Sequence, residues 1–202
     1  MRPILLTVAG NPQNQDRGLV IEDGLRLVLC VADGAGGLSG GAEAATLAVD
    51  LVHQNASLIG NADSCAEVLR KIDGTIAKDS IAGETTCALA IVTSEEIFGA
   101  SVGDSGVWLI PESGDCHNLT QSQQRKPFLG SGSAWPIPFK HPNAKGSLLL
   151  ATDGLLKYTS AERIIAACRD HPADLASQRL IELVRYPSGA LPDDVTLILT
   201  RL

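Results

Sequence analysis

LRLVLCVADGAGG, residues 25–37, is the most informative segment of the chain. It begins with an apolar run typical of a buried strand, which ends at Asp33 and is followed by a glycine-rich stretch. Asp23-Gly24 lies just before the run and is a strong signal for a hairpin to a strand over residues 19–22. The segment therefore predicts an antiparallel strand pair that carries an acidic residue at its end.

The elements predicted on either side of this pair occur in blocks. They are a strand over 4–8, helices over 42–54 and 62–78, short strands over 86–93, 97–102, 107–110, 117–119 and 147–152, helices over 159–168 and 173–186, and a strand over 194–202. Blocks of strands and helices, rather than strict alternation, favour an α+β fold. We expect antiparallel sheets sandwiched between helices.

Length and composition indicate one globular domain over residues 1–202. Hydrophobic residues make up 45% of the chain and charged residues 19%, which argues against disorder. A net charge of −7 repels a phosphate backbone, and 3% aromatic residues leave little for base stacking, so no nucleic-acid partner is expected. A substrate that carries phosphate would need bound cations to reverse the local field.

Cysteine usage and hydropathy favour the cytoplasm. The five cysteines include no C-x-x-C pair, and the N-terminal apolar run is too short for a secretory leader. No stretch approaches the ~18–20 apolar residues of a membrane span, so no membrane partner is expected. We expect the chain to act as a monomer.

Four aspartates stand at the ends of predicted strands. Asp33 and Asp153 each follow an apolar strand and precede a glycine, Asp104 lies in a Gly-Asp-Ser-Gly turn, and Asp193 heads the last strand. Strand ends of one sheet lie close together, so these carboxylates can converge on a hard cation. Taken singly, each is more simply a turn residue, because Asp and Gly favour turn conformations. Only the ordered set favours a metal site.

An ordered series of short motifs runs along nearly the whole chain. It comprises Asn14-Gln15-Asp16, Val31-Ala32-Asp33-Gly34-Ala35-Gly36-Gly37, Gly83-Glu84-Thr85-Thr86, Gly103-Asp104-Ser105, Ala151-Thr152-Asp153-Gly154 and Asp193-Asp194-Val195-Thr196. This series resembles the protein phosphatase 2C family. The resemblance implies a four-layer α-β-β-α sandwich of two antiparallel sheets flanked by helices, with two Mn²⁺ or Mg²⁺ ions at one end.

The resemblance also implies roles for individual residues. Asp33 corresponds to the carboxylate that bridges both ions, and Gly34 would offer its carbonyl oxygen to one of them. Asp153 and Asp193 would bind the other ion. Asp16 corresponds to an acid outside the ligand set that orients metal-bound water, so Asp16 and Asp33 are the expected catalytic residues.

The chain departs from the family at the phosphate-binding position. The family usually carries an Arg five positions before the residue matched by Asp16, and here that position is Asn11. Arg supplies both charge and bidentate geometry to an anion, so its loss matters. The candidates to replace it are Arg17, Arg125 and Lys126.

Further departures concern a third ion and the flap. Asp104 corresponds to a residue that can contact a weak third ion together with Asp153, but Lys157 stands where some relatives have another Asp, which argues against that ion. Ala35 cannot protonate a leaving group as the His of some relatives is proposed to do. The flap region, around residues 121–145, is short.

The implied activity is hydrolysis of phosphoserine and phosphothreonine in proteins by direct attack of water activated at a dinuclear centre. No covalent phosphoenzyme is needed, so no Cys or Ser nucleophile is expected. Two alternatives stay open. One is a weakly active or non-catalytic regulatory module that binds a partner protein, and the other is a phosphatase for small phosphoesters.

Overall fold

The structure is a computed structural model that describes residues 2–24, 26–35, 40–143 and 145–202. Its strands form two five-stranded sheets in which every pairing is antiparallel. One sheet has the order β1-β10-β9-β6-β7 and the other the order β2-β3-β4-β5-β8. The strands are β1 (Ile4–Val8), β2 (Asp16–Asp23), β3 (Arg26–Asp33), β4 (Cys87–Val92), β5 (Glu96–Val102), β6 (Gly106–Pro111), β7 (His117–Asn118), β8 (Ile137–Pro142), β9 (Gly146–Ala151) and β10 (Val195–Arg201).

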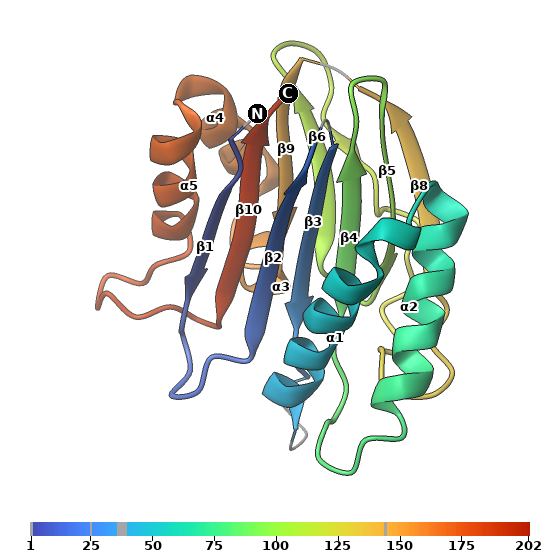
Figure 1. The fold of residues 1–202 in the computed structure, drawn as a ribbon. Coiled ribbons are helices and arrows are strands. Elements are labelled where there is room, and N and C mark those ends of the chain that lie inside the picture. The colour runs from blue at the N-terminus through green and yellow to red at the C-terminus, as the bar shows by residue number, and fades with distance from the viewer. Residues whose placement is uncertain (1, 25, 36–39, 144) are drawn as a thin grey trace.

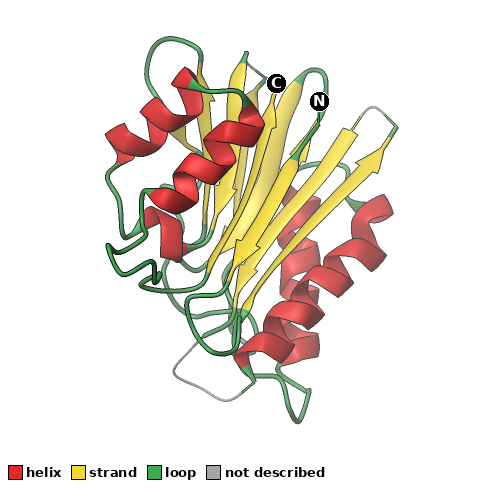
Figure 2. Ribbon diagram, turned by 90° about the vertical axis from the view of Figure 1, so that its left-hand side faces the viewer, coloured by secondary structure: helices red, strands yellow, loops and turns green. Residues whose placement is uncertain are grey.

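Helices cover the outer face of each sheet, so the molecule has four layers (Figures 1 and 2). Helices α1 and α2 pack on the β2–β8 sheet, and α4 and α5 pack on the β1–β7 sheet. The helices are α1 (Gly41–Asn55), α2 (Ala62–Ile76), α3 (Asp153–Leu156), α4 (Ala161–Asp170) and α5 (Ala173–Glu182), with a 3₁₀ turn at Ala56–Leu58. The α+β class and the sandwich expected from the sequence are confirmed.

Strand β3 shows why its sequence is apolar throughout. Successive side chains of a strand point to opposite faces. Val28 and Cys30 pack toward α1 and α2, whereas Leu29 and Val31 pack between the two sheets. Both faces of β3 are therefore buried, which requires a continuous apolar run instead of an alternating one.

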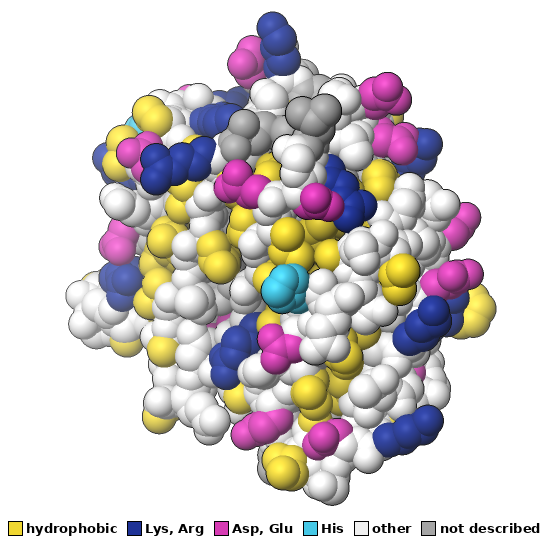
Figure 3. All heavy atoms as spheres, viewed as in Figure 1, with side chains coloured by type: hydrophobic (Ala, Val, Ile, Leu, Met, Phe, Trp, Pro, Cys, Tyr) yellow, Lys and Arg dark blue, Asp and Glu magenta, His cyan; other side chains and the backbone are white. Residues whose placement is uncertain are grey.

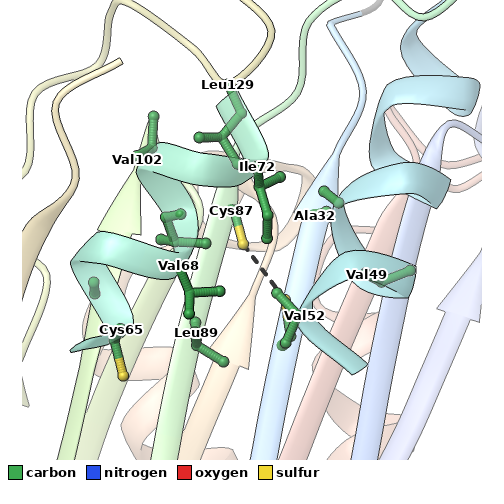
Figure 4. Close-up of a cluster of buried hydrophobic side chains, with 14 of the residues drawn as sticks. Ala32, Val49, Val52, Cys65, Val68, Ile72, Cys87, Leu89, Val102 and Leu129 are labelled. Atoms are coloured by element: carbon green, nitrogen blue, oxygen red, sulfur yellow. Dashed lines mark hydrogen bonds between the residues drawn. The ribbon is translucent and has the colours of Figure 1, made fainter. Parts of the chain in front are cut away.

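The core beneath α1 and α2 is built from aliphatic side chains and thiols. Figure 4 shows Val68 and Ile72 of α2 above Leu89 and Cys87 of β4. The Sγ atoms of Cys87 and Cys30 are 3.4 Å apart, and both thiols are fully buried. These cysteines serve as small packed hydrophobes, as their apolar sequence context predicts.

The segment predicted as a flap over 121–145 is partly regular structure. Its last part forms β8, which pairs with β5. Pro138 and Pro142 argued against a strand here, because proline is tolerated in a sheet only at an edge, and β8 is an edge strand. Phe139 lies opposite Gly99 of β5, where the missing side chain leaves room for the ring. The irregular connection therefore ends at Pro136, before β8 begins.

Charged side chains are dispersed over the face that Figure 3 shows. On the face seen in Figure 3, acidic, basic and apolar groups are interspersed, and the acidic excess forms no continuous patch. Among the described residues, no helix has the length and apolar character needed to cross a membrane.

Candidate metal centre

Two of the predicted acids face each other across adjacent strands. Asp16 begins β2 and Asp33 ends β3, and the register of the hairpin places them directly opposite. These strand ends lie at the lower end of the sandwich in Figure 1, away from both termini. Like charges directly opposite in a sheet destabilise it. The fold therefore accepts an unfavourable pair of carboxylates at this end.

Asp16 is the most deeply buried acid of the group, with 2% of its surface exposed. Its Oδ2 accepts a hydrogen bond of 2.8 Å from Thr152 Oγ1, just after β9. Its Oδ1 is buried and has no partner among the described residues. A buried carboxylate oxygen without a donor is costly, so Asp16 Oδ1 is a position at which an additional donor would stabilise the protein.

Asp33 is held by its backbone. Its N–H donates to Thr86 Oγ1 at 3.0 Å, and its carbonyl oxygen accepts from the backbone N–H of Thr86 at 2.8 Å and from Thr85 Oγ1 at 2.9 Å. Thr86 Oγ1 also shares a hydrogen bond of 2.7 Å with Ser105 Oγ. These bonds fix the end of β3 and connect it to the turn that contains Asp104.

Asp153 begins α3, a short helix that the sequence did not reveal. A Cβ atom added to Gly154 would lie 1.9 Å from the carbonyl oxygen of Asp194, and one added to Gly34 would lie 2.3 Å from that of Gly41. Glycine is required where two backbones approach so closely. The repeated strand–Asp-Gly pattern thus marks two places where a neighbouring backbone crosses directly behind an acid.

Asp193 and Asp194 precede β10 and have different tasks. Asp193 Oδ1 accepts from Asn11 Nδ2 at 3.0 Å. Asp194 is 5% exposed and accepts from the backbone N–H groups of Gly10, Asn11 and Gln15 at 2.8–3.0 Å. Sequence analysis did not single out Asp194, although its place beside Asp193 at a strand head was a usable signal. The Asp194 carboxylate holds the loop between β1 and β2 beside the cavity.

These groups surround a cavity of about 530 Å³. Its lining residues are Asn11, Gln15, Asp33, Gly34, Ala35, Glu84, Thr86, Asp104, Arg125, Lys126, Phe128, Asp153, Lys157, Asp193 and Asp194. All five residues predicted to bind metal are in this lining, and Asp16 is buried next to it. Arg17 is not in the lining, because its guanidinium donates to the carbonyl oxygens of Asn14 and Asp16 and to Thr46 Oγ1.

Burial and mutual repulsion raise the pKa of the clustered acids. Burial, followed by the charges of Asp16 and Asp153, raises the pKa of Asp33 to about 10. Burial is also the main cause that raises the pKa of Asp16 to about 7. The pKa of Asp153 is raised by burial and then by the charge of Asp104. In the absence of cations, these acids therefore retain protons at a higher pH than free carboxyl groups do, because burial and mutual repulsion disfavour their ionised forms.

Two basic side chains contact the acids at the cavity mouth. Arg125 Nε lies 2.8 Å from Asp104 Oδ2, and Lys157 Nζ lies 4.0 Å from Asp153 Oδ2. The Nζ atom of Lys126 lies 5.4 Å from the centre of the Phe128 ring. Positive charge is thus present around the acids, but it reaches only those nearest the solvent.

A sequence model of the protein phosphatase 2C family matches residues 8–178. The chain belongs to the protein phosphatase 2C family. The matched range begins in β1 and ends within α5, and it contains every aspartate of the cavity except Asp193 and Asp194. The resemblance seen in the ordered motifs is therefore confirmed, and the enzyme class of the family is the phosphoprotein phosphatase that the motifs imply.

A curated protein and two solved structures show what this chain is similar to. Probable protein phosphatase 2C 33 of Oryza sativa subsp. japonica is 26% identical over 176 residues, which is 63% of this chain and 40% of that protein. The chain thus spans less than half of that relative. A solved bacterial serine phosphatase is 20% identical, with a TM-score of 0.86 over 100% of this chain and 97% of that one. The catalytic domain of the phosphatase PstP, solved with 2 manganese ions, is 21% identical, with a TM-score of 0.79 over 98% and 96% of the two chains.

Proposed function

We propose that this member of the phosphatase 2C family hydrolyses phosphoserine and phosphothreonine in proteins, with two Mn²⁺ or Mg²⁺ ions as cofactors. One observation carries the proposal. Carboxylates from separate strand ends share an open cavity, and the pKa values of Asp16, Asp33 and Asp153 are all raised. Clustered acids whose ionised forms repel one another are suited to bind hard cations, which replace the protons and remove the repulsion.

The residues at the cavity fit such ions. Asp33 and the carbonyl oxygen of Gly34 would hold one ion, and Asp33, Asp153 and Asp193 would hold the other. Oxygen donors of this kind suit Mg²⁺ and Mn²⁺. Among the described residues, no three His, Cys, Asp or Glu side chains lie close enough together to form a complete metal site as they stand. The 2 manganese ions of the PstP structure support the same stoichiometry.

When bound, the cations lower the pKa of water and neutralise phosphate oxygens. The chain itself orients the attacking water. Asp16 Oδ1 has no donor among the described residues, whereas Oδ2 is bonded to Thr152 Oγ1. Because Oδ1 is buried beside the cavity, it would accept a hydrogen bond from that water only once the water enters the space next to Asp16. The hydrogen bond from Thr152 therefore fixes the orientation of the Asp16 carboxylate and leaves Oδ1 as the oxygen without a protein donor.

Attack by water also agrees with the position of the nucleophilic side chains. In the described part of the chain, no cysteine or serine lines the cavity. Burial raises the pKa of Cys65 and of Cys168 to about 12, so these thiols stay protonated near neutral pH. The Thr86 hydroxyl lines the cavity, but it is bonded to the N–H of Asp33 and to Ser105.

A hydrolysis assay tests the proposal. The purified protein should hydrolyse p-nitrophenyl phosphate and phosphoserine peptides with Mn²⁺, and EDTA or Asp33→Ala should abolish turnover. Asp50→Ala, an exposed change on α1, is the matched control and should retain activity. Turnover that is unchanged without Mn²⁺ and unchanged in Asp33→Ala would contradict the proposal.

The assay also separates the alternatives. A phosphorylated protein is the proposed substrate, and equal rates on phosphopeptides and nucleotides would favour a phosphatase for small phosphoesters. Mn²⁺ binding without any turnover would favour a regulatory module that binds a partner, an alternative motivated by Asn11. Monomeric state and cytoplasmic location stay predictions.

A further inference from the structure

The phosphate-binding role left open by Asn11 needs a cation at the cavity. The Asn11 side chain is neutral and already donates to Asp193 Oδ1. Arg17 lies outside the lining, with its guanidinium bonded to backbone carbonyls. The basic residues in the described lining are Arg125, Lys126 and Lys157. Among the described residues, the possible substitutes for an Arg at position 11 are therefore these three side chains.

Arg125 is the one of the three that a carboxylate orients for bidentate contact. Its Nε lies 2.8 Å from Asp104 Oδ2. Among the described residues, its two Nη atoms have no hydrogen-bond partner. A guanidinium held through Nε keeps its Nη1–Nη2 edge available, and that edge matches two oxygens of a phosphate. Lys126 and Lys157 carry point charges and lack this geometry.

The backbone around Arg125 is fixed to the same turn as Asp104. Gln124 accepts a hydrogen bond from the backbone N–H of Gly103 at 3.3 Å through its carbonyl oxygen. Gln123 Nε2 donates to the carbonyl oxygen of Ser105 at 2.9 Å. The three consecutive residues Gln123, Gln124 and Arg125 therefore each form a hydrogen bond to the Gly-Asp-Ser turn. This contact places Arg125 at the cavity although 70% of its side chain is exposed.

The turn also connects Arg125 to the metal ligands. Ser105 Oγ shares a hydrogen bond with Thr86 Oγ1, which accepts from the N–H of Asp33. The guanidinium is thus connected to Asp33 through its bond to Asp104, the adjoining residue Ser105 and the hydrogen bonds of Ser105 and Thr86. The Asp104 carboxylate is already paired with the Arg125 guanidinium, and the Lys157 ammonium lies near Asp153.

We propose that Arg125 binds the substrate phosphate and that Asp104 is its positioning residue instead of a ligand for a third ion. This inference rests on the proposed phosphatase function and specifies its substrate contact. The phosphate would be held between cations bound at Asp33, Asp153 and Asp193 and the terminal nitrogens of Arg125. Positive charge would then reach the phosphate from two sides.

Inorganic phosphate, the product of the reaction, is the probe for the test. Its dissociation constant from the Mn²⁺-loaded protein is measured by calorimetry and as a competitive inhibition constant. Arg125→Ala should weaken phosphate binding about tenfold and raise KM more than it lowers kcat. Arg125→Lys should recover only part of this loss, because an ammonium lacks the fork geometry.

Asp104→Asn distinguishes the two roles of Asp104. A positioning role predicts weaker phosphate binding with an unchanged number of bound Mn²⁺ ions, and no further loss when Asp104→Asn is added to Arg125→Ala. Loss of an Mn²⁺ ion in Asp104→Asn would overturn this role. Exposed ion pairs add little to stability, so both variants should keep the wild-type melting temperature.

The matched control is the ion pair of Lys140 and Glu96, with Nζ and Oε2 2.6 Å apart and similar side-chain exposure, 65% and 30%. Neither residue lines the cavity. Lys140→Ala and Glu96→Gln should leave phosphate binding unchanged. Phosphate binding by Arg125→Ala equal to wild type would refute the inference, even if Asp33→Ala confirms the phosphatase. Failure of the phosphatase itself is recognised separately, by the absence of Mn²⁺-dependent turnover in the wild type.

Discussion

The cavity has an acidic floor and a basic rim that are held by different parts of the fold. The floor consists of Asp33, Asp153 and Asp193 with Asp16 buried behind them, and all four are buried or half-buried at or next to the ends of strands. The rim consists of Arg125, Lys126 and Lys157, which are exposed and lie outside the strands. The floor is therefore fixed by the sheets, whereas the rim depends on side-chain contacts made across the surface.

This difference suits the two tasks that we propose. Metal ligands must keep a set geometry, which sheet backbone provides. A substrate contact must allow a phosphorylated segment to enter and leave, and an exposed side chain on an irregular segment permits this. Changes in the floor should therefore affect metal binding, and changes in the rim should affect substrate binding.

The largest effect is expected at the floor. Asp153→Ala should lower the affinity for Mn²⁺ and reduce kcat/KM more than the roughly 10–100-fold that is typical of residues behind the ligands. Calorimetric titration with Mn²⁺ and the p-nitrophenyl phosphate assay measure the two quantities. Retention of full Mn²⁺ affinity would show that Asp153 is not a ligand.

Asp16→Asn should have a smaller effect. The amide removes the acceptor charge at the water but keeps the shape, so we expect kcat to fall roughly 10–100-fold with little change in Mn²⁺ affinity. With EDTA at pH 8, the variant should melt at a higher temperature than wild type, because it no longer buries a charge. A lower melting temperature would mean that the hydrogen bond from Thr152 already offsets the cost of burying this carboxylate.

Asp73→Asn tests how the rim is attached. Asp73 lies on α2 and accepts from the backbone N–H groups of Gly130, Gly132 and Ala134 at 2.8–3.1 Å. This carboxylate ties the segment after Phe128 to the body. We expect a loss of about 1–3 kcal/mol in unfolding free energy and a higher KM, with Mn²⁺ affinity preserved. Urea unfolding and steady-state kinetics provide the measurements, and a weakened Mn²⁺ affinity would show that floor and rim are not separable.

The smallest effect concerns the pH dependence of the metal-free protein. Burial raises the pKa of Asp16 to about 7 and that of Asp33 to about 10, from 3.8. The folded state thus holds protons that the unfolded chain releases, so this stabilisation is complete below pH 3.8 and is lost as pH rises through the raised values. Between pH 5 and 8 in EDTA, the melting temperature should fall by at least about 2–4 °C, which corresponds to about 1 kcal/mol.

Bound metal should reverse this trend. Mn²⁺ replaces the protons at the carboxylates, so the metal-loaded protein should gain stability over the same pH range. Calorimetric scans with Mn²⁺ and with EDTA at each pH measure the difference. Parallel pH profiles under the two conditions would argue against cations at these acids.

The sequence alone determined the sandwich and most of its strands, although not β8, and it indicated the acids of the floor. Asp33 and Asp153 could be recognised because each apolar run, its terminal acid and the following glycine are adjacent in the chain. Such local patterns carry their own structural signal, since strand burial and turn conformation are set by neighbouring residues. The ordered series of these motifs was sufficient to indicate the family.

Only the tertiary structure decided how the rim is built. The pairing of Arg125 with Asp104 joins residues 21 positions apart, Asp73 reaches Gly130 across 57, and Asn11 meets Asp193 across 182. It also placed Arg17 outside the cavity and left Asp16 Oδ1 without a donor among the described residues. Each of these depends on how distant segments pack, and a polar surface residue carries no periodic pattern from which its partner could be predicted. The acids of this site are thus encoded locally, whereas the phosphate contact that we propose is a product of the fold.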